Sequence, residues 1–326
     1  MLYPLKFGNI YFEKIWGGRD LELFRNNLPE GSIGESWDVA CHPHGTSVVA
    51  NGEYKGMKLN ELIELKAQEI IGDKISKTWF PLLVKLINAK EKLSVQVHPE
   101  DEYAMKTEGE MGKTEVWYIV EAFEGANIVV GTKECTKEQF EKAIEVGEFD
   151  ELMNKIPIRK GEVYFVKSGL IHAIGEGVII AEIQQNSDTT YRVYDYNRGR
   201  ELHIEKALEV VNLSLRGEKS TGLRLKMKGY SKTYYCACQH FSLELYEIDD
   251  KITETSDKER FYIYTVVEGQ GEIIYSGGDE RISYGDSILI PAYMGEYEIK
   301  GKLKLLKSYV PNLKRLETEI LSNVIK

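Results

Sequence analysis

The sequence predicts a mainly β protein built from two barrels, with a few inserted helices. Short alternating or β-branched runs recur along the chain, including KLSVQVH, TEVWYIV, EVYFV, GVIIAEI, HFSLELYEI and DSILIP. Each run is bounded by Gly, Pro, Asn or charged residues, which is typical of strands that end in turns. The 326 residues are enough for about two domains, each with a core of its own.

Three segments have the apolar periodicity of a helix. The first lies near residues 58–71 and the third near residues 203–215. The second opens with a capping-box pattern from Thr136 to Gln139 and extends to Leu152. We expect these helices to be insertions that pack on the barrels.

A weak internal repeat indicates two copies of one barrel motif. The stretch from Gly161 to His172 has the same frame as the stretch from Gly285 to Glu296. This frame resembles the second motif of the cupin superfamily, in which a Gly starts a strand and a His points into the barrel as a metal ligand. The resemblance implies two cupin-type jelly-roll barrels, a bicupin, of which only the first keeps the His.

The boundary between the two domains is expected in the Gly- and Lys-rich stretch RGEKSTGLRLKMKGYSK. We therefore predict a metal-binding catalytic domain with helical insertions over residues 1–225. Residues 226–326 are predicted to form a second, metal-free barrel.

The bulk composition excludes several classes of protein. A net charge of −10 and the lack of a basic run argue against nucleic acid and anionic lipid as partners. No stretch approaches the roughly 20 apolar residues of a membrane span, and the first residues do not resemble a signal peptide. Four cysteines are few for this length, which fits a reducing compartment. We expect a soluble cytoplasmic protein that binds no membrane.

The segment 92–98 carries the first candidate ligands. Its apolar and polar residues alternate, so period-two geometry places Ser94, Gln96 and His98 on one face of a strand. Pro99 then ends the strand. Taken alone, this segment is also compatible with a half-exposed edge strand whose His faces solvent.

Other stretches complete a donor set that suits a catalytic metal. Lys113 and Glu115 share a face of the next strand, and His172 closes the first copy of the repeat. Catalytic zinc takes about three protein ligands and keeps one position open, whereas structural sites are usually closed by thiolates, and no Cys belongs to this group. One carboxylate leaves a Zn²⁺ site positive, and Lys113 would raise that charge.

These residues together resemble the type I mannose-6-phosphate isomerases in their short bacterial form. The pattern comprises Ser94-x-Gln96-x-His98-Pro99, Lys113-x-Glu115, His172, and Glu182 followed by SDTTYR ending at Arg192. The likeness runs from IWGG (15–18) and GESWDVACHPHG (34–45) to about residue 215. It implies a zinc-dependent bicupin that interconverts mannose 6-phosphate and fructose 6-phosphate, with one Zn²⁺ per chain held by Gln96, His98, Glu115 and His172.

The resemblance also suggests roles around the metal. It offers Lys113, Glu182 and Asp188 as proton-handling residues and places Arg192 in the pocket, where it would steady an enediolate or the phosphate. Ser94 and Arg198 are expected to help bind the phosphate. Arg198 stands where many family members have the Lys of a TPK sequence, because YRVYDYNR replaces their usual VRAGLTPK.

Two alternatives stay open on the sequence. Cupins with two His and one Glu also hold Fe(II) or Mn(II), so a dioxygenase or a different sugar-phosphate isomerase is possible. A neutral Gln beside Lys113 favours anion binding over oxygen chemistry. A non-catalytic sugar-phosphate-binding regulator is the second alternative, and the presence of Arg192, Glu182 and Asp188 argues against it. The expected partner is a small sugar phosphate, and the expected assembly is a monomer or homodimer.

Overall fold

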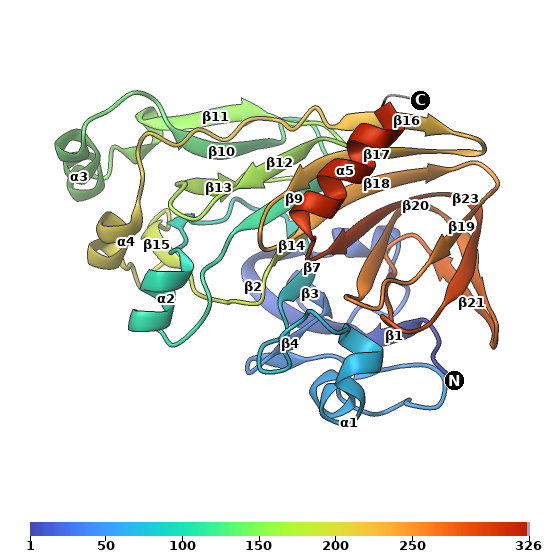
Figure 1. Cartoon of the computed structure of the whole chain (residues 1–326). Coiled ribbons are helices and arrows are strands. Elements are labelled where there is room, and N and C mark those ends of the chain that lie inside the picture. Colours follow the sequence, from blue (N-terminus) through green and yellow to red (C-terminus); the bar gives the residue numbers. More distant parts are fainter. Residues whose placement is uncertain (325–326) are drawn as a thin grey trace. The chain divides into compact units, whose positions relative to one another are not determined.

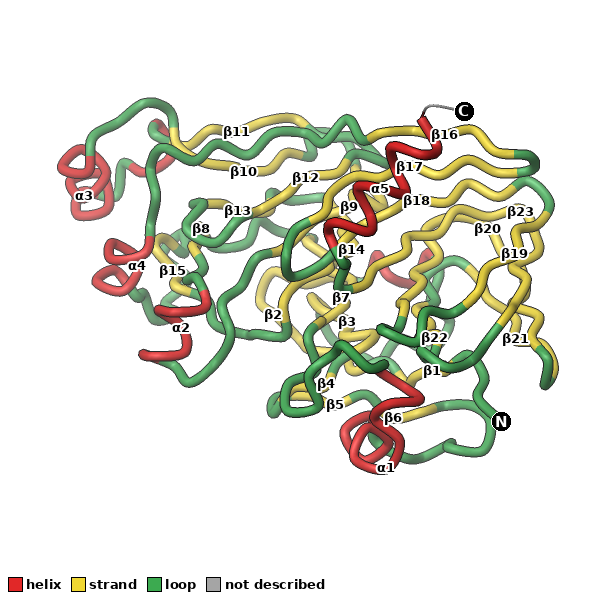
Figure 2. Tube along the Cα trace, in the orientation of Figure 1, coloured by secondary structure: helices red, strands yellow, loops and turns green. Residues whose placement is uncertain are grey.

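The computed structural model describes residues 1–324 (Figure 1). Strands make up most of its regular structure, and the helices are separate pieces between them (Figure 2). The mainly β class predicted from the alternating runs is therefore confirmed. No described helix is long and apolar enough to cross a membrane.

The chain packs into two compact units that are interleaved in sequence. Unit 1 contains residues 1–10, 37–84 and 221–326, and unit 2 contains residues 11–36 and 85–220. This division differs from the single boundary expected near residue 225, although the last change of unit, at residues 220–221, lies close to it. Strand pairing explains why the N-terminus joins unit 1, since Leu5 pairs with Leu289 across nearly the whole chain.

Unit 1 is dominated by a ten-stranded sheet in the order β16-β17-β18-β23-β20-β22-β1-β6, with β19 paired to β23 and β21 to β20. Its helices are α1 (Leu59–Ile71) and α5 (Leu313–Val324). Its strands are β1 (Leu5–Gly8), β4 (Cys41–His42), β5 (Gly45–Thr46), β6 (Val48–Val49), β16 (Leu223–Met227), β17 (Tyr230–Ala237), β18 (Ser242–Ile248), β19 (Lys251–Thr255), β20 (Tyr262–Tyr275), β21 (Gly278–Ser283), β22 (Ser287–Ile290) and β23 (Glu296–Tyr309).

Unit 2 is built on a five-stranded sheet, β11-β10-β13-β8-β15, and a six-stranded sheet, β12-β9-β14-β7-β3-β2. Strands β2, β3 and β7 extend across the division between the units. The strands are β2 (Ile10–Gly18), β3 (Ile33–Val39), β7 (Leu82–Ala89), β8 (Val95–Val97), β9 (Glu115–Ala122), β10 (Asn127–Thr132), β11 (Met153–Pro157), β12 (Val163–Val166), β13 (His172–Ile174), β14 (Val178–Gln185) and β15 (Tyr191–Tyr194). The helical segments are η1 (Asp20–Leu23), α2 (Asp101–Thr107), α3 (Lys137–Val146), η2 (Phe149–Glu151) and α4 (Ile204–Val210).

The five-stranded sheet of unit 2 is buried on both faces. Ile128 and Ile174 on one face pack with residues of the six-stranded sheet, such as Trp117. Val95 and Val97 on the other face pack with Phe140 of α3 and with other residues from the helical insertions. The insertions therefore cover the outer face of this sheet, and polar side chains on its inner face are shielded from water.

The three predicted helices exist, and two of them end earlier than the apolar pattern suggested. Thr136 caps α3 and makes both bonds of the capping box with Gln139. This helix ends at Gly147, whose φ of 74° stops the spiral before Leu152. Helix α4 ends because Val211 is extended and the N–H of Asn212 donates to the carbonyl oxygen of Gly169 instead of continuing the helix.

The interior of unit 1 contains an ammonium group. The Nζ atom of Lys307 on β23 lies 3.0 Å from a carboxylate oxygen of Glu254 and 3.8 Å from the ring centre of Tyr262. Only 5% of Lys307 is exposed. Although burial alone lowers the pKa of Lys307, the Glu254 carboxylate outweighs it and the pKa lies above its usual value. The pair thus stays ionised within the fold.

Replacing Lys307 with Met should destabilise the protein by about 3 kcal/mol, because the change leaves Glu254 without its cation in a largely buried site. Urea unfolding of the full chain measures this loss. Lys300→Met is the matched control on the same strand, because 54% of that side chain is exposed and its loss should cost less than about 0.5 kcal/mol. An unchanged urea midpoint for Lys307→Met would contradict the structural role of the pair.

Candidate active site

Strand β8 presents its polar residues to the interior of unit 2. Val95 and Val97 are fully buried in the outer core, so the alternation turns Gln96 and His98 to the opposite face. His98 is 0% exposed, and β8 lies between β13 and β15. The alternative of an edge strand with a solvent-facing His is therefore excluded.

His98, Glu115 and His172 converge at one point. Their ligand atoms all lie within 4.8 Å of one another, and all three residues are buried. The Nε2 atom of His98 lies 3.6 Å from Oε2 of Glu115, and the Nε2 atom of His172 lies 3.5 Å from Oε1. Within residues 1–324 this is the one group of three His, Cys, Asp or Glu residues found at such spacing.

The two imidazoles are oriented as metal ligands. Nδ1 of His98 is 3.0 Å from the carbonyl oxygen of Thr189, and Nδ1 of His172 is 2.8 Å from that of Leu170. A backbone carbonyl can only accept, so each Nδ1 carries the proton and each Nε2 offers a lone pair toward Glu115. Burial lowers the pKa of His172 to about 4 and holds the pKa of His98 well below its usual value, so both rings are neutral.

Three of the ligand atoms at the centre of this group lack hydrogen bonds. Both carboxylate oxygens of Glu115 and the Nε2 atom of His98 are buried without a hydrogen-bond partner in the described part of the chain. Buried polar atoms of this kind are rare unless an ion or water satisfies them. Two neutral imidazoles and one carboxylate with free lone pairs fit a divalent cation, and His₂Glu is a known donor set for catalytic zinc.

Gln96 lies beside this group. Its Nε2 atom is 3.3 Å from Nε2 of His172, because the two residues are direct partners in the pairing of β8 with β13. Rotation of the amide exchanges its oxygen and nitrogen and would present the oxygen to the same point. The Nζ atom of Lys113 lies 3.3 Å from Oε2 of Glu115. All four expected ligands and Lys113 are therefore brought together.

A turn and a loop position these residues at the site. Gly169 has a φ of +81°, and its N–H donates to the carbonyl oxygen of His98, which draws the start of β13 to the end of β8. Glu110 fixes the loop before β15 by accepting bonds from the hydroxyl groups of Thr189 and Ser187. That loop supplies the carbonyl that orients His98. Glu110 was not among the predicted residues, and no sequence motif marks it.

A cavity of about 240 Å³ lies next to the group, although His98, Glu115 and His172 are not themselves on its lining. Gln96 and Lys113 line its wall, and Gln96 contacts His172 while Lys113 contacts Glu115 behind them. The other predicted residues on the lining are Ser94, Glu182, Asp188 and Arg192. Arg198 is not on the lining, whereas Arg200 is.

The cavity also contains a buried lysine, Lys85, that the sequence analysis did not single out. Lys85 on β7 is 3% exposed, and its Nζ atom lies 3.6 Å from Glu182 and 3.8 Å from Glu35. Trp117 donates its indole N–H to the other oxygen of Glu182 at 3.0 Å. In the sequence, the signal for this lysine was a single charged residue within the apolar run LLVKLINA. A lysine in a buried strand is expected to have an acidic partner, because an unpaired Lys is almost never buried.

The charges in the cavity influence one another. Burial and the nearby Glu115 raise the pKa of Glu182, against the opposing effect of the Lys113 and Lys85 ammonium groups. Burial alone lowers the pKa of Lys113, but Glu115, Glu182 and Asp188 outweigh it and raise the pKa above its usual value. Lys113 therefore stays charged, and Glu182 is protonated more easily than an ordinary glutamate.

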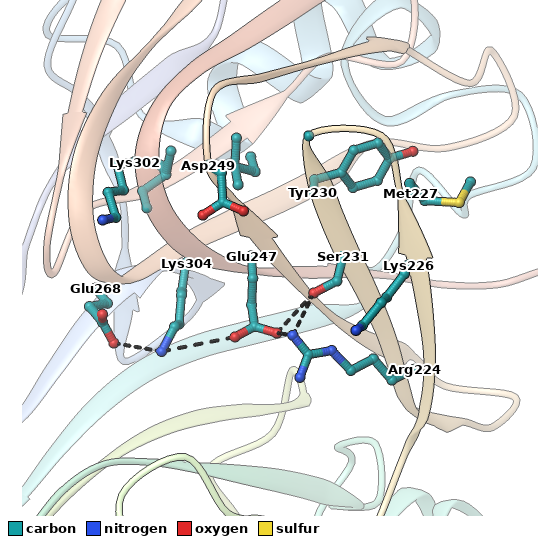
Figure 3. Close-up of a pocket in the computed structure, with 13 residues that line it drawn as sticks. Arg224, Lys226, Met227, Tyr230, Ser231, Glu247, Asp249, Glu268, Lys302 and Lys304 are labelled. Carbon is teal, nitrogen blue, oxygen red and sulfur yellow. Dashed lines mark hydrogen bonds and ion pairs between the residues drawn. The ribbon is translucent and has the colours of Figure 1, made fainter.

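A second cavity, of about 310 Å³, lies on unit 1 and has a different character (Figure 3). Four of its charged groups form ion pairs: Arg224 contacts Glu247 at 2.6 Å, and Lys304 contacts Glu268 at 2.9 Å. No His or Cys lines it. The cavity of unit 2, with its unsatisfied buried ligand atoms, is the better candidate for an active site.

Comparison with known proteins agrees with this geometry. The family model of the phosphomannose isomerase type I catalytic domain matches residues 5–124, and that of the mannose-6-phosphate isomerase cupin domain matches residues 231–310. The chain is 38% identical to mannose-6-phosphate isomerase ManA of Bacillus subtilis, with 94% of this chain and 99% of the relative covered. It is 37% identical to mannose-6-phosphate isomerase of Streptococcus mutans, with 95% and 99% covered.

Solved structures give the same result. The crystal structure of mannose 6-phosphate isomerase from Bacillus subtilis superposes with a TM-score of 0.88 at 36% identity and covers 94% of this chain and 99% of that one. A putative mannosephosphate isomerase from Archaeoglobus fulgidus shares the fold, with a TM-score of 0.77 at 24% identity over 95% and 98% of the two chains. The extent and identity of these matches show that the chain belongs to the type I mannose-6-phosphate isomerase family.

Proposed function

We propose that the protein is a zinc-dependent aldose–ketose isomerase that interconverts mannose 6-phosphate and fructose 6-phosphate through an enediolate. The observation that carries the proposal is the buried His98–Glu115–His172 group with its unsatisfied ligand atoms behind a cavity lined by cations. The names of the relatives support the same reaction.

Zinc suits the donor set, and we propose one ion per chain held by Gln96, His98, Glu115 and His172. The set contains nitrogen and oxygen donors and no thiolate, which is typical of a catalytic site with an open position. When bound, Zn²⁺ would supply Lewis-acid polarisation of the substrate carbonyl and would stabilise the negative charge that develops on it.

Substrate binding depends on the cations of the cavity. The chain as a whole carries a charge of −10, so an anionic sugar phosphate needs a locally positive pocket. Arg192 on β15 and Lys113 supply that charge, and Ser94 adds a hydroxyl group next to Arg192, with Oγ 3.3 Å from Nε. Arg192 is proposed to steady the phosphate or the enediolate, and Ser94 to help hold the phosphate.

Proton transfer between the two carbons is assigned to an acidic side chain. Nearby carboxylates outweigh the effect of burial and raise the pKa of Lys113, and we assign its ammonium group to donate a hydrogen bond to the enediolate oxygen. Glu182 has a pKa shifted toward neutrality, which suits a group that must both take and return a proton. Asp188, which also lines the cavity, is the second candidate.

All of the proposed site residues come from one chain, so a monomer or a homodimer would suffice. A charged sugar phosphate does not cross membranes freely, and we propose that the protein works in the cytoplasm. No observation favours oxygen chemistry or a non-catalytic regulator, because the cavity combines a metal group, cations and buried acids.

Chelation should abolish the isomerisation of mannose 6-phosphate, and added zinc should restore it, because the carbonyl then loses and regains its polarising cation. Metal analysis of the purified protein should give one zinc per chain. Unchanged turnover after exhaustive chelation would refute the role of the metal.

His172→Ala should eliminate both bound metal and turnover, because it removes one Nε2 ligand from the group. Glu296→Ala is the matched control at the equivalent position of the repeat, where the side chain is exposed at the start of β23. This control should keep both metal and turnover. Equal losses in the two variants would show that the second copy of the repeat also contributes to metal binding and turnover.

Glu182→Gln should lower kcat by about 10²- to 10⁴-fold while zinc content stays at the wild-type level, because the amide cannot exchange the proton. Glu124→Gln, an exposed carboxylate, is the control and should leave kcat unchanged. If Glu182→Gln keeps wild-type kcat, the proton-transfer role passes to Asp188, whose Asn variant is then the next measurement.

A further inference from the structure

The segment that follows β15 forms an unusually tight turn at the edge of the cavity. Tyr196 and Asn197 have φ values of 53° and 60°, and the N–H of Arg198 donates to the carbonyl oxygen of Asp195 at 3.1 Å. Two successive left-handed residues reverse the chain as in a type I′ turn. The left-handed conformation is costly for a bulky residue such as Tyr196, by roughly 1–2 kcal/mol. The surrounding contacts must therefore hold the turn in place.

The guanidinium donors of Arg198 are engaged in contacts that hold this turn. Its guanidinium donates to the carbonyl oxygen of Lys92 at 2.8 Å and to both the carbonyl and the carboxylate of Asp195. Its Cζ atom lies 5.3 Å from the ring centre of Tyr196, and Lys92 covers the same ring at 3.8 Å. These contacts explain why Arg198 does not line the cavity.

The returning chain brings Arg200 to the cavity instead. The N–H of His203 donates to the carbonyl oxygen of Arg192, so residues 200–203 run back beside Arg192. Arg200 lines the cavity together with Arg192 and Ser94. Asp195, which is 3% exposed, aims the Arg200 guanidinium by accepting bonds from its Nε and Nη2 atoms.

The two cavity arginines retain unused donors. Nε and Nη2 of Arg200 bind Asp195, and Nε and Nη1 of Arg192 bind Ser94 and the carbonyl oxygen of Glu201. Within residues 1–324, no hydrogen bond involves Nη1 of Arg200 or Nη2 of Arg192. Arg198 and Arg200 share one paired carboxylate, Asp195, so these two guanidinium groups keep a net positive charge beside Arg192.

We infer that Arg200, aimed by Asp195, acts with Arg192 as the phosphate-binding pair of the site, and that Arg198 instead fixes the turn that carries them. A phosphate monoester carries up to two negative charges and several acceptor oxygens, which match two guanidinium groups with free N–H donors. The inference rests on the proposed isomerase function, and it moves the phosphate contact from residue 198 to residue 200.

The test compares Arg200→Ala, Arg200→Lys and Arg198→Ala in the zinc-loaded full chain. Arg200→Ala should raise the KM for mannose 6-phosphate and the inhibition constant of inorganic phosphate by at least about tenfold, with kcat within about threefold of wild type. Arg200→Lys should recover part of the affinity, since it restores the charge without the fork of donors.

Arg198→Ala should raise KM less than Arg200→Ala and should lower the unfolding temperature. Arg159→Ala, an exposed arginine of the same unit, is the control and should change none of these values.

Asp195→Asn tests the positioning role separately. It should raise KM in the same direction as Arg200→Ala, and combining the two changes should add little, because both act through the same guanidinium. Fully additive effects would contradict the coupling between Asp195 and Arg200.

The inference is overturned if Arg200→Ala keeps wild-type KM and phosphate inhibition, or if Arg198→Ala weakens phosphate binding more than Arg200→Ala. If the zinc-loaded wild type shows no turnover at all, the isomerase proposal fails by itself. Calorimetric titration with inorganic phosphate then decides the inference: binding lost in Arg200→Ala but kept in Arg159→Ala supports it, and equal binding in both overturns it.

Discussion

The site of this protein depends on one buried carboxylate. Glu115 is 0% exposed, and neither of its oxygens accepts a hydrogen bond from the described residues. Removing a carboxylate from water costs several kcal/mol unless opposite charge compensates it. The Lys113 ammonium at 3.3 Å provides part of that compensation, and the two neutral imidazoles face the same oxygens with lone pairs that repel negative charge. A divalent cation between the three side chains resolves both problems, which is why the arrangement is best understood as a metal centre.

The rest of unit 2 keeps this group dry and rigid. Val95 and Val97 anchor β8 in the outer core that α3 helps to close, while Trp117 packs against His172 with its ring centre 5.5 Å away and also donates to Glu182. The same indole therefore contacts a metal-ligand candidate and the proposed proton-transfer residue. Packing of this kind restricts the side chains of the proposed acid and of the candidate ligands.

The cavity is lined by both acids and cations. The buried acids Glu115 and Glu182 pair with Lys113 and Lys85, and among the described residues Arg198 and Arg200 pair with Asp195. Arg192 lies close to both groups of charges, because it is the strand partner of Gln96 and lines the cavity together with Arg200. The proposed reaction and the inferred phosphate contact therefore use neighbouring parts of one cavity.

The sequence by itself determined the strand alternation, the donor types and the family resemblance, because these depend on local periodicity and on residue identity. It placed Gln96 and His98 on one face of a strand, and the capping box at Thr136 predicted where α3 begins. The roles assigned to individual site residues stay predictions.

Only the tertiary structure decided which side chains share the cavity. No local motif marks Glu110, which fixes the loop before β15, and the lone charge of Lys85 in an apolar run does not reveal its partners. Arg200 reaches the cavity where Arg198 does not, because Tyr196 and Asn197 reverse the chain in the left-handed region. The interleaving of the two units, set by pairing between residues as distant as Leu5 and Leu289, has the same origin: long-range contacts leave no local pattern in the sequence.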